Sequence, residues 1–169
     1  HLGQSLGLPS KKCELLLYAS PMHDVGKIGI PDSILLKPGK LDGGEWEVMK
    51  SHVDIGVEIL SDHPSEIIRL ARTIALTHHE KWDGSGYPNG LTGDAIPIEG
   101  RIAAVCDVFD ALVSERPYKH AWTTEEAFLF IEENSGRHFD PDVVGEFREN
   151  LPRILRIREQ YPDAGQPLD

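Results

Sequence analysis

Four histidines and two aspartates interrupt stretches of the chain whose apolar pattern is that of packed helices. They are His23, Asp24, His52, His78, His79 and Asp107. A single histidine on an apolar face is usually satisfied within the core, but a buried carboxylate is costly unless it is paired or coordinates a metal. A shared metal centre would satisfy all six groups, because neutral imidazole and carboxylate are ligands for divalent iron, manganese, nickel or zinc. The sequence therefore predicts a metal site built from nitrogen and oxygen ligands.

The number of candidate ligands favours two metal ions over one. Asp24 adjoins His23, so its carboxylate is the natural bridge between the two ions. Two ions about 3.5–4 Å apart can hold a hydroxide at neutral pH and stabilise the entering and leaving oxygens of a phosphoryl displacement. This chemistry suits phosphodiester hydrolysis. A redox-active di-iron centre that activates oxygen is an alternative that the ligand types alone leave open.

Three basic residues are candidates for contact with a phosphate. Lys27 follows Asp24 by three residues in a glycine-rich turn, although a lone lysine is more often a solvated surface charge. Arg116 and Lys119 follow the apolar segment that carries Asp107. Arginine binds phosphate oxygens with two parallel N–H groups, and lysine binds them as a point charge. The alternative is that these residues form a basic helix end that offsets the helix dipole.

The elements that must position these residues are helices, separated by glycine and proline, with no alternating strand pattern. We expect helices from an N-cap at Ser10 to about Asp24, from about 45 to 60, from about 64 to 79, from Pro97 as first helical residue, from an N-cap at Thr123 and from about Pro141. The helix from Pro97 is apolar almost all round, so it should be central, with Cys106 as a small core residue. In the second of these helices, one inward stripe would comprise Val48, His52, Ile55 and Ile59.

Composition bounds the class of protein. The 169 residues have the length of one domain, and 40% apolar side chains argue against disorder. The chain has 17 basic and 28 acidic residues and a net charge of −11, which argues against a broad surface that binds nucleic-acid polymers. No apolar run reaches the ~18–20 residues of a membrane span. Two cysteines are too few for a disulfide scaffold, so we expect a reducing compartment, the cytoplasm.

Two sequence motifs contain most of these candidate residues. The first is HDVGK at 23–27 followed by IPD at 30–32, and the second is HHEKWDGSGYP at 78–88. Both motifs resemble the signatures of the HD-GYP domain family. Further segments continue the pattern: LKPGKL at 36–41, DVFDAL at 107–112, RPYK at 116–119 and FDP at 139–141. The resemblance extends from about Leu15 to Phe147, and the long second signature makes it specific.

The resemblance implies an all-α HD-domain bundle of about six to seven helices, with a glycine-rich loop over the metal site. It implies metal-dependent hydrolysis of cyclic di-GMP to the linear dinucleotide pGpG, to GMP, or to both. The centre would contain two divalent ions, or three as in trinuclear members, with iron or manganese expected and nickel or zinc as alternatives. One ion would be held by Asp24, His52, His78 and His79, and the other by His23, Asp24 and Asp107.

The resemblance also implies roles for residues around the metals. Besides the bridging Asp24, Lys27 would be catalytic, because it would contact the scissile phosphate and help the leaving 3′ oxygen. Arg116 and Lys119 would hold the substrate phosphates. An upstream receiver or sensor domain would regulate the site. The family has a loop associated with guanine-nucleotide specificity and with docking of diguanylate cyclases. In this sequence the loop matches Gly86, Tyr87 and Pro88.

The start of the chain departs from the family pattern. Residues 1–8 read as the last turns of a helix, and the family's further histidine, with a glutamate in trinuclear members, would lie upstream of His1. We therefore expect residues 1–160 to be one HD-GYP domain that lacks the start of its first helix, with a frayed tail at 161–169. Without that ligand, the chain could instead be a catalytically impaired cyclic-dinucleotide receptor or a protein-interaction module. A di-iron oxygenase and a nucleotide phosphohydrolase on the same scaffold are further alternatives.

Overall fold

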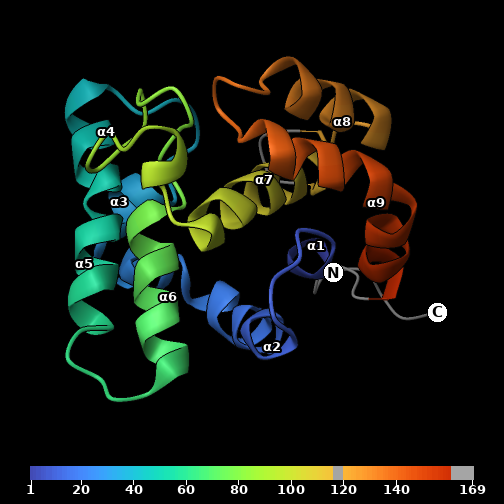
Figure 1. Ribbon diagram of the computed structural model, residues 1–169. Helices are drawn as coiled ribbons and strands as arrows, with labels where there is room; N and C mark the ends of the chain where they lie inside the picture. Colours follow the sequence, from blue (N-terminus) through green and yellow to red (C-terminus); the bar gives the residue numbers. More distant parts are fainter. Residues whose placement is uncertain (116–119, 161–169) are drawn as a thin grey trace.

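The computed structural model describes residues 1–115 and 120–160, and within these ranges the chain is an all-helical bundle without β-strands (Figure 1). The predicted all-α fold is confirmed. The α-helices are α1 (Leu2–Ser5), α2 (Ser10–Ala19), α3 (Asp32–Leu35), α4 (Gly43–Lys50), α5 (His52–Ile59), α6 (Glu66–Thr77), α7 (Ile98–Val113), α8 (Thr124–Glu133) and α9 (Pro141–Gln160). Short 3₁₀ turns lie at η1 (Ser20–Met22), η2 (Val25–Gly29) and η3 (Gly93–Ala95). None of the helices in the described part combines the length and the apolar sequence needed to cross a bilayer.

Helix α7 forms the centre of the bundle, as its apolar sequence predicts. It contacts α6, α8 and α9, and Figure 1 shows it running between the α5–α6 pair and the α8–α9 pair. Its Val105 and Phe109 are buried, and the Phe109 ring meets Phe147 of α9 edge to face at 5.0 Å. This apolar core supplies the main stabilising free energy of the fold, since burial of apolar surface is the dominant favourable contribution.

The predicted position of Cys106 in this core is wrong. Cys106 is exposed, because its side of α7 does not pack against a neighbouring helix but borders a cavity of about 530 Å³. The walls of this cavity include Leu16 and Leu17 of α2 and Ile154 of α9. A cavity of this kind leaves the thiol accessible, whereas Val105, one residue earlier in the chain, points into the core.

The first predicted helix ends earlier than the sequence indicated. Helix α2 stops at Ala19 and tightens into η1, which carries Pro21. A proline inside an α-helix lacks the N–H that would bond to the preceding turn and clashes with the carbonyl group there, so the α-helix cannot continue to Asp24. The predicted N-cap at Ser10 is also wrong, because Ser10 is the first helical residue and Pro9 precedes it without a side-chain cap.

The predicted helix over 45–60 forms two helices instead of one. Helix α4 ends at Lys50, α5 begins at His52, and the Ser51 hydroxyl donates to the Val48 carbonyl oxygen at 2.7 Å. Such a bond from a serine side chain satisfies a carbonyl group at a helix end and competes with continuation of the helix. The predicted stripe is therefore broken: His52 is buried, whereas Val48 and Ile59 are exposed.

Two other helix boundaries follow their sequence signals. At the start of α8 the Thr123 side chain accepts from the Glu126 backbone N–H, and the Glu126 side chain accepts from the Thr123 backbone N–H. Helix α9 begins at Pro141. Pro97 lies in extended conformation one residue before the start of α7, at the N-cap rather than at the predicted first helical position.

A close approach between two backbones sets the position of the segment that carries the His-Asp pair. The turn η2 packs against α5, and a Cβ atom added at Gly26 would overlap the carbonyl oxygen of His52 and the nitrogen of Gly56. Only glycine fits this position, because any other residue would push η2 away from α5. The contact thereby fixes Asp24 relative to His52.

We predict that Gly26→Ala destabilises the protein by about 3 kcal/mol or more, because the added methyl group meets backbone atoms that cannot move aside as a side chain can. Urea unfolding followed by circular dichroism measures the change. Gly145→Ala in α9 is the matched control, because a Cβ atom there meets no other atom within 4 Å. Alanine in place of a helical glycine should stabilise the control by up to about 1 kcal/mol. Equal stability of the two variants would contradict the close approach.

Candidate metal centre

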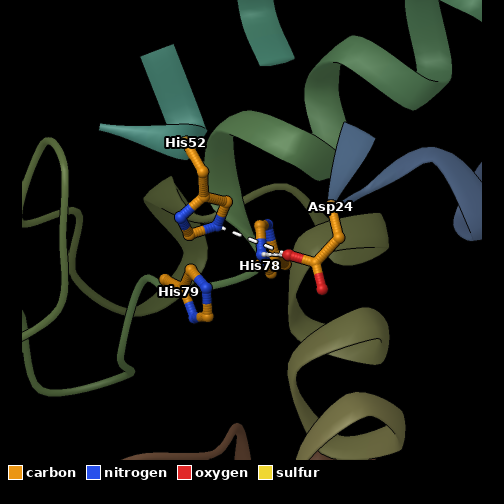
Figure 2. A group of neighbouring side chains, drawn as sticks. All are labelled: Asp24, His52, His78 and His79. Carbon is orange, nitrogen blue, oxygen red and sulfur yellow. Dashed lines mark ion pairs between the residues drawn. The ribbon is translucent and has the colours of Figure 1, made fainter. Parts of the chain in front are cut away.

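Asp24, His52, His78 and His79 come together from three segments of the chain (Figure 2). One potential ligand atom from each residue lies within 4.8 Å of those of the others. His52 begins α5, the two adjacent histidines follow α6, and Asp24 lies between η1 and η2. Figure 2 shows the rings of His52 and His78 directed at the same oxygen of the Asp24 carboxylate.

Backbone carbonyl groups fix the orientation of three histidine rings at the site. Nδ1 of His52, of His78 and of His23 lies 2.7, 3.0 and 2.8 Å from the carbonyl oxygen three residues earlier in the chain. A carbonyl oxygen only accepts hydrogen bonds, so Nδ1 carries the proton and donates it. In His52 and His78 the unprotonated Nε2 atom then faces the cluster. A histidine that binds a metal through one ring nitrogen usually donates such a hydrogen bond from the other ring nitrogen.

The atoms that face the centre of the cluster lack hydrogen-bond partners. Nε2 of His52 and of His78 lies 3.5 and 3.8 Å from Oδ1 of Asp24, which is too long for a hydrogen bond. These three atoms and Nε2 of His23 are buried without a hydrogen-bond partner. Unpaired buried polar atoms are rare in folded proteins. Converging lone pairs of imidazole and carboxylate fit a divalent metal ion, which would satisfy them together.

His23 and Asp107 extend the cluster on the other side of Asp24. Nε2 of His23 lies 3.3 Å from Oδ2 of Asp24 and 3.4 Å from Oδ1 of Asp107. Oδ1 of Asp24 therefore faces one pair of histidines and Oδ2 faces a different histidine. The other five residues singled out from the sequence therefore lie around the Asp24 carboxylate, and its two oxygens face different histidines.

Burial and neighbouring charges act differently on the individual histidines. Burial lowers the pKa of His79 to about 3, with the neighbouring imidazoles contributing, and it also lowers the pKa of His52. Both rings are therefore neutral at pH 7, as a metal ligand must be. Burial also disfavours the charged form of His23, but the neighbouring carboxylates of Asp107 and Asp24 outweigh burial and raise its pKa to about 10. A cation that bound His23 would have to displace that proton.

Lys27 lies at the edge of the cluster and is partly exposed. Its Nζ donates to Oδ2 of Asp24 at 2.5 Å. Burial raises the pKa of Asp24, but the hydrogen bond from Lys27 and the neighbouring rings of His23 and His78 outweigh burial and hold the pKa well below its usual range. The carboxylate is therefore ionised at neutral pH. The other two predicted phosphate-binding residues, Arg116 and Lys119, lie outside the described residues.

The predicted Gly86-Tyr87-Pro88 loop covers one side of the cluster. The Tyr87 ring stacks on the His79 ring, with centroids 4.8 Å apart and planes 25° apart, and its backbone N–H donates to the His79 carbonyl oxygen at 3.2 Å. A Cβ atom at Gly86 would overlap backbone atoms of Glu80 and Lys81, so the loop can return this closely only with glycine there.

Glu80 holds this loop, a role that we did not predict from the sequence. Its side chain is only 2% exposed, and its carboxylate accepts the backbone N–H groups of Asn89 at 2.8 Å and Leu91 at 3.0 Å. These bonds join the two ends of the loop that carries Tyr87. The sequence did contain a signal for this role. An acidic residue lies directly after two candidate ligands and directly before a glycine-rich loop, and the backbone N–H groups of such a loop need acceptors.

Comparison with known proteins gives a consistent result. The family profile described as HD domain matches residues 1–143. Over 162 residues the chain is 51% identical to the 3′3′-cGAMP-specific phosphodiesterase 2 of Vibrio cholerae. It is 53% identical over 162 residues to the cyclic di-GMP phosphodiesterase of Thermotoga maritima, and 48% identical over 163 residues to the cyclic di-GMP phosphodiesterase response regulator RpfG of Xanthomonas campestris.

The matches cover 96% of this chain but only 31%, 44% and 43% of those three relatives, so the chain spans less than half of their lengths. Among solved structures, the cyclic GMP-AMP specific phosphodiesterase V-cGAP3 of V. cholerae is similar in fold, with a TM-score of 0.64 at 20% sequence identity. That match covers 96% of this chain and 44% of the other. It supports the fold alone.

We predict that Asp24→Asn abolishes the binding of divalent metal ions at this site. The amide keeps the shape of the side chain but carries no charge, and its NH₂ group only donates hydrogen bonds. It therefore cannot replace the two charged oxygens of the carboxylate as metal ligands. Metal content per chain after loading with Mn²⁺ and desalting, measured by mass spectrometry, gives the result. Asp62→Asn is the control, because Asp62 is exposed and asparagine tolerates its positive φ of 51°. Undiminished metal content in the Asp24 variant would exclude this site.

We predict that Glu80→Gln loosens the loop without unfolding the domain. The amide retains one acceptor oxygen but turns its NH₂ group toward the second backbone donor, which costs about 1–3 kcal/mol locally. Hydrogen exchange at the amides of Asn89 and Leu91 should become faster. Glu66→Gln is the control, because Glu66 is exposed and pairs only with the exposed Lys11. Unchanged exchange in the Glu80 variant would contradict the anchoring role.

Proposed function

Because this chain belongs to the HD domain family, we propose that it is the hydrolase domain of a cyclic-dinucleotide phosphodiesterase of the HD-GYP type, which cleaves cyclic di-GMP to pGpG, to GMP, or to both. One observation carries the proposal: Asp24, His52, His78 and His79 converge, and the facing atoms of the first three are buried without hydrogen-bond partners. The names of the relatives at about half sequence identity supply the class of substrate.

The six clustered residues would hold two divalent ions, with iron or manganese preferred. Asp24 Oδ1, His52, His78 and His79 would bind one ion, and Asp24 Oδ2, His23 and Asp107 the other. Ions bound in this way supply positive charge for the phosphoryl oxygens and lower the pKa of water, so that a hydroxide nucleophile is available at neutral pH. A third ion, as in trinuclear members of the family, would need ligands beyond these six residues.

Lys27 would act on the scissile phosphate. Its ammonium group is held at the edge of the cluster by Asp24, and its side chain is 40% exposed, so it can turn toward a bound substrate. There it would neutralise a phosphoryl oxygen and donate a proton to the leaving 3′ oxygen. Arg116 and Lys119 would hold the phosphates of the substrate. The loop with Gly86, Tyr87 and Pro88 would line the nucleotide site, since Tyr87 lies on His79.

A second substrate, 3′3′-cGAMP, is favoured by a specific observation. A relative that is 51% identical is named a 3′3′-cGAMP-specific phosphodiesterase. Both cyclic dinucleotides present two phosphodiesters and two purine bases, so the same metal cluster could act on either. A receptor that binds the nucleotide without cleaving it remains the alternative from another class of protein. An oxygenase or a nucleoside-triphosphate hydrolase would fit the metal ligands but not the names of the relatives.

The regulatory context is also part of the proposal. A relative named a response regulator, of which this chain matches 43%, supports an attached receiver or sensor domain and a cytoplasmic location. A diguanylate cyclase, which makes the substrate, would be the partner that docks at the Tyr87 loop.

The test is turnover by the chain after loading with Mn²⁺ or Fe²⁺. Cyclic di-GMP, 3′3′-cGAMP and GTP are supplied separately, and products are identified by chromatography. We expect pGpG or GMP from the cyclic substrates, no cleavage of GTP, and loss of turnover in Asp24→Asn but not in Asp62→Asn. Saturable binding without product would establish the receptor instead, and preferential cleavage of GTP would overturn the proposed substrate class.

A further inference from the structure

Helix α4 contributes no buried residue to the fold, although it carries a tryptophan. Trp46 is 45% exposed, and none of the residues of Gly43–Lys50 is buried. The helix is nevertheless well anchored, because Asp42 caps it and Lys37 donates two hydrogen bonds to Glu45 at 2.7 and 2.6 Å. A large, half-exposed aromatic ring on a firmly held helix is typical of a binding surface rather than of a core.

One face of α4 lies against the loop that covers the metal cluster. Trp46 and Lys50 are one helical turn apart and share this face. The Trp46 ring meets the Tyr87 ring edge to face at 6.2 Å with planes 82° apart, and Nζ of Lys50 lies 5.7 Å from the centre of the same ring. Tyr87 in turn stacks on His79. Figure 1 shows α4 beside this loop, at the opposite end of the α5–α6 pair from the turn that joins them.

The pairing of the two rings leaves aromatic surface available. Trp46 remains 45% exposed beside Tyr87. Lys50 also pairs with Glu47 at 2.8 Å, but Glu47 is 70% exposed on its side chain, so this ion pair is weak. The corner between α4 and Tyr87 therefore offers a flat apolar surface and a positive charge next to the metal ligand His79.

We propose that Trp46 and Lys50 of α4 form a wall of the substrate site, where Trp46 stacks on a purine base of the cyclic dinucleotide and Lys50 attracts the phosphate that is not being cleaved. This inference rests on the proposed function and names the residues that bind the part of the substrate away from the metals. Aromatic stacking suits any purine, so the wall supplies affinity for cyclic dinucleotides as a class. Lys50 offsets locally the net charge of −11, which otherwise repels an anionic substrate.

The experiment compares Trp46→Ala, Trp46→Phe and Lys50→Met with the wild-type chain in steady-state hydrolysis of cyclic di-GMP. Loss of one stacked base corresponds to about a 5- to 150-fold weaker interaction, so Trp46→Ala should raise KM by that factor with kcat and metal content nearly unchanged. Trp46→Phe should recover part of the affinity. Lys50→Met should raise KM by up to about fivefold, with a smaller dependence on salt.

Val48→Ala is the matched control, because Val48 is a similarly exposed residue of α4 two positions from Trp46 and on a different face. A second readout is tryptophan fluorescence on rapid mixing with cyclic di-GMP, where quenching should occur in the wild type and in Val48→Ala but be reduced in Trp46→Phe. An unchanged KM in Trp46→Ala would overturn the inference while the proposed function stands. A wild-type chain that neither binds nor cleaves the nucleotide would overturn both.

Discussion

The two oxygens of the Asp24 carboxylate face different groups, and the arrangement of the whole site depends on this division. Oδ1 is directed at His52 and His78, whereas Oδ2 faces His23 and accepts from Lys27. A half-buried charge in this position is stable only among cations or strong donors. The same carboxylate therefore accounts for the lysine placed at its edge, and it would be shared by the two ions proposed for the site.

The fold presents these groups by means of helix ends rather than helix faces. His52 begins α5, His78 follows α6, and each ring donates from Nδ1 to a carbonyl oxygen of the preceding turn, which leaves Nε2 free. The third segment reaches them because Gly26 allows η2 to touch the backbone of α5. The apolar core around α7 lies beside the site and supplies the stability that a cluster of unpaired polar atoms cannot provide.

The sequence was sufficient to predict the helical class, the central helix and the five residues that lie around Asp24, because residue type and the second signature carry that information. It did not reveal where helices break. Pro21 ends α2 and Ser51 divides α4 from α5, yet neither interrupts the apolar periodicity. Cys106 was misplaced because periodicity cannot show that one side of α7 borders a cavity. The roles of Glu80 and Trp46 depend on contacts with a folded loop, which local patterns do not encode.

The loop clamped by Glu80 has a consequence for how the domain acquires its ions. Its bonds to Asn89 and Leu91 involve protein atoms alone, so the chain itself holds the loop above His79. In small domains that fold around a metal, the binding energy is spent on ordering the chain. A loop held by its own hydrogen bonds would avoid that entropic cost. The choice of ion would then follow the chemistry of its imidazole and carboxylate ligands rather than the folding of the loop.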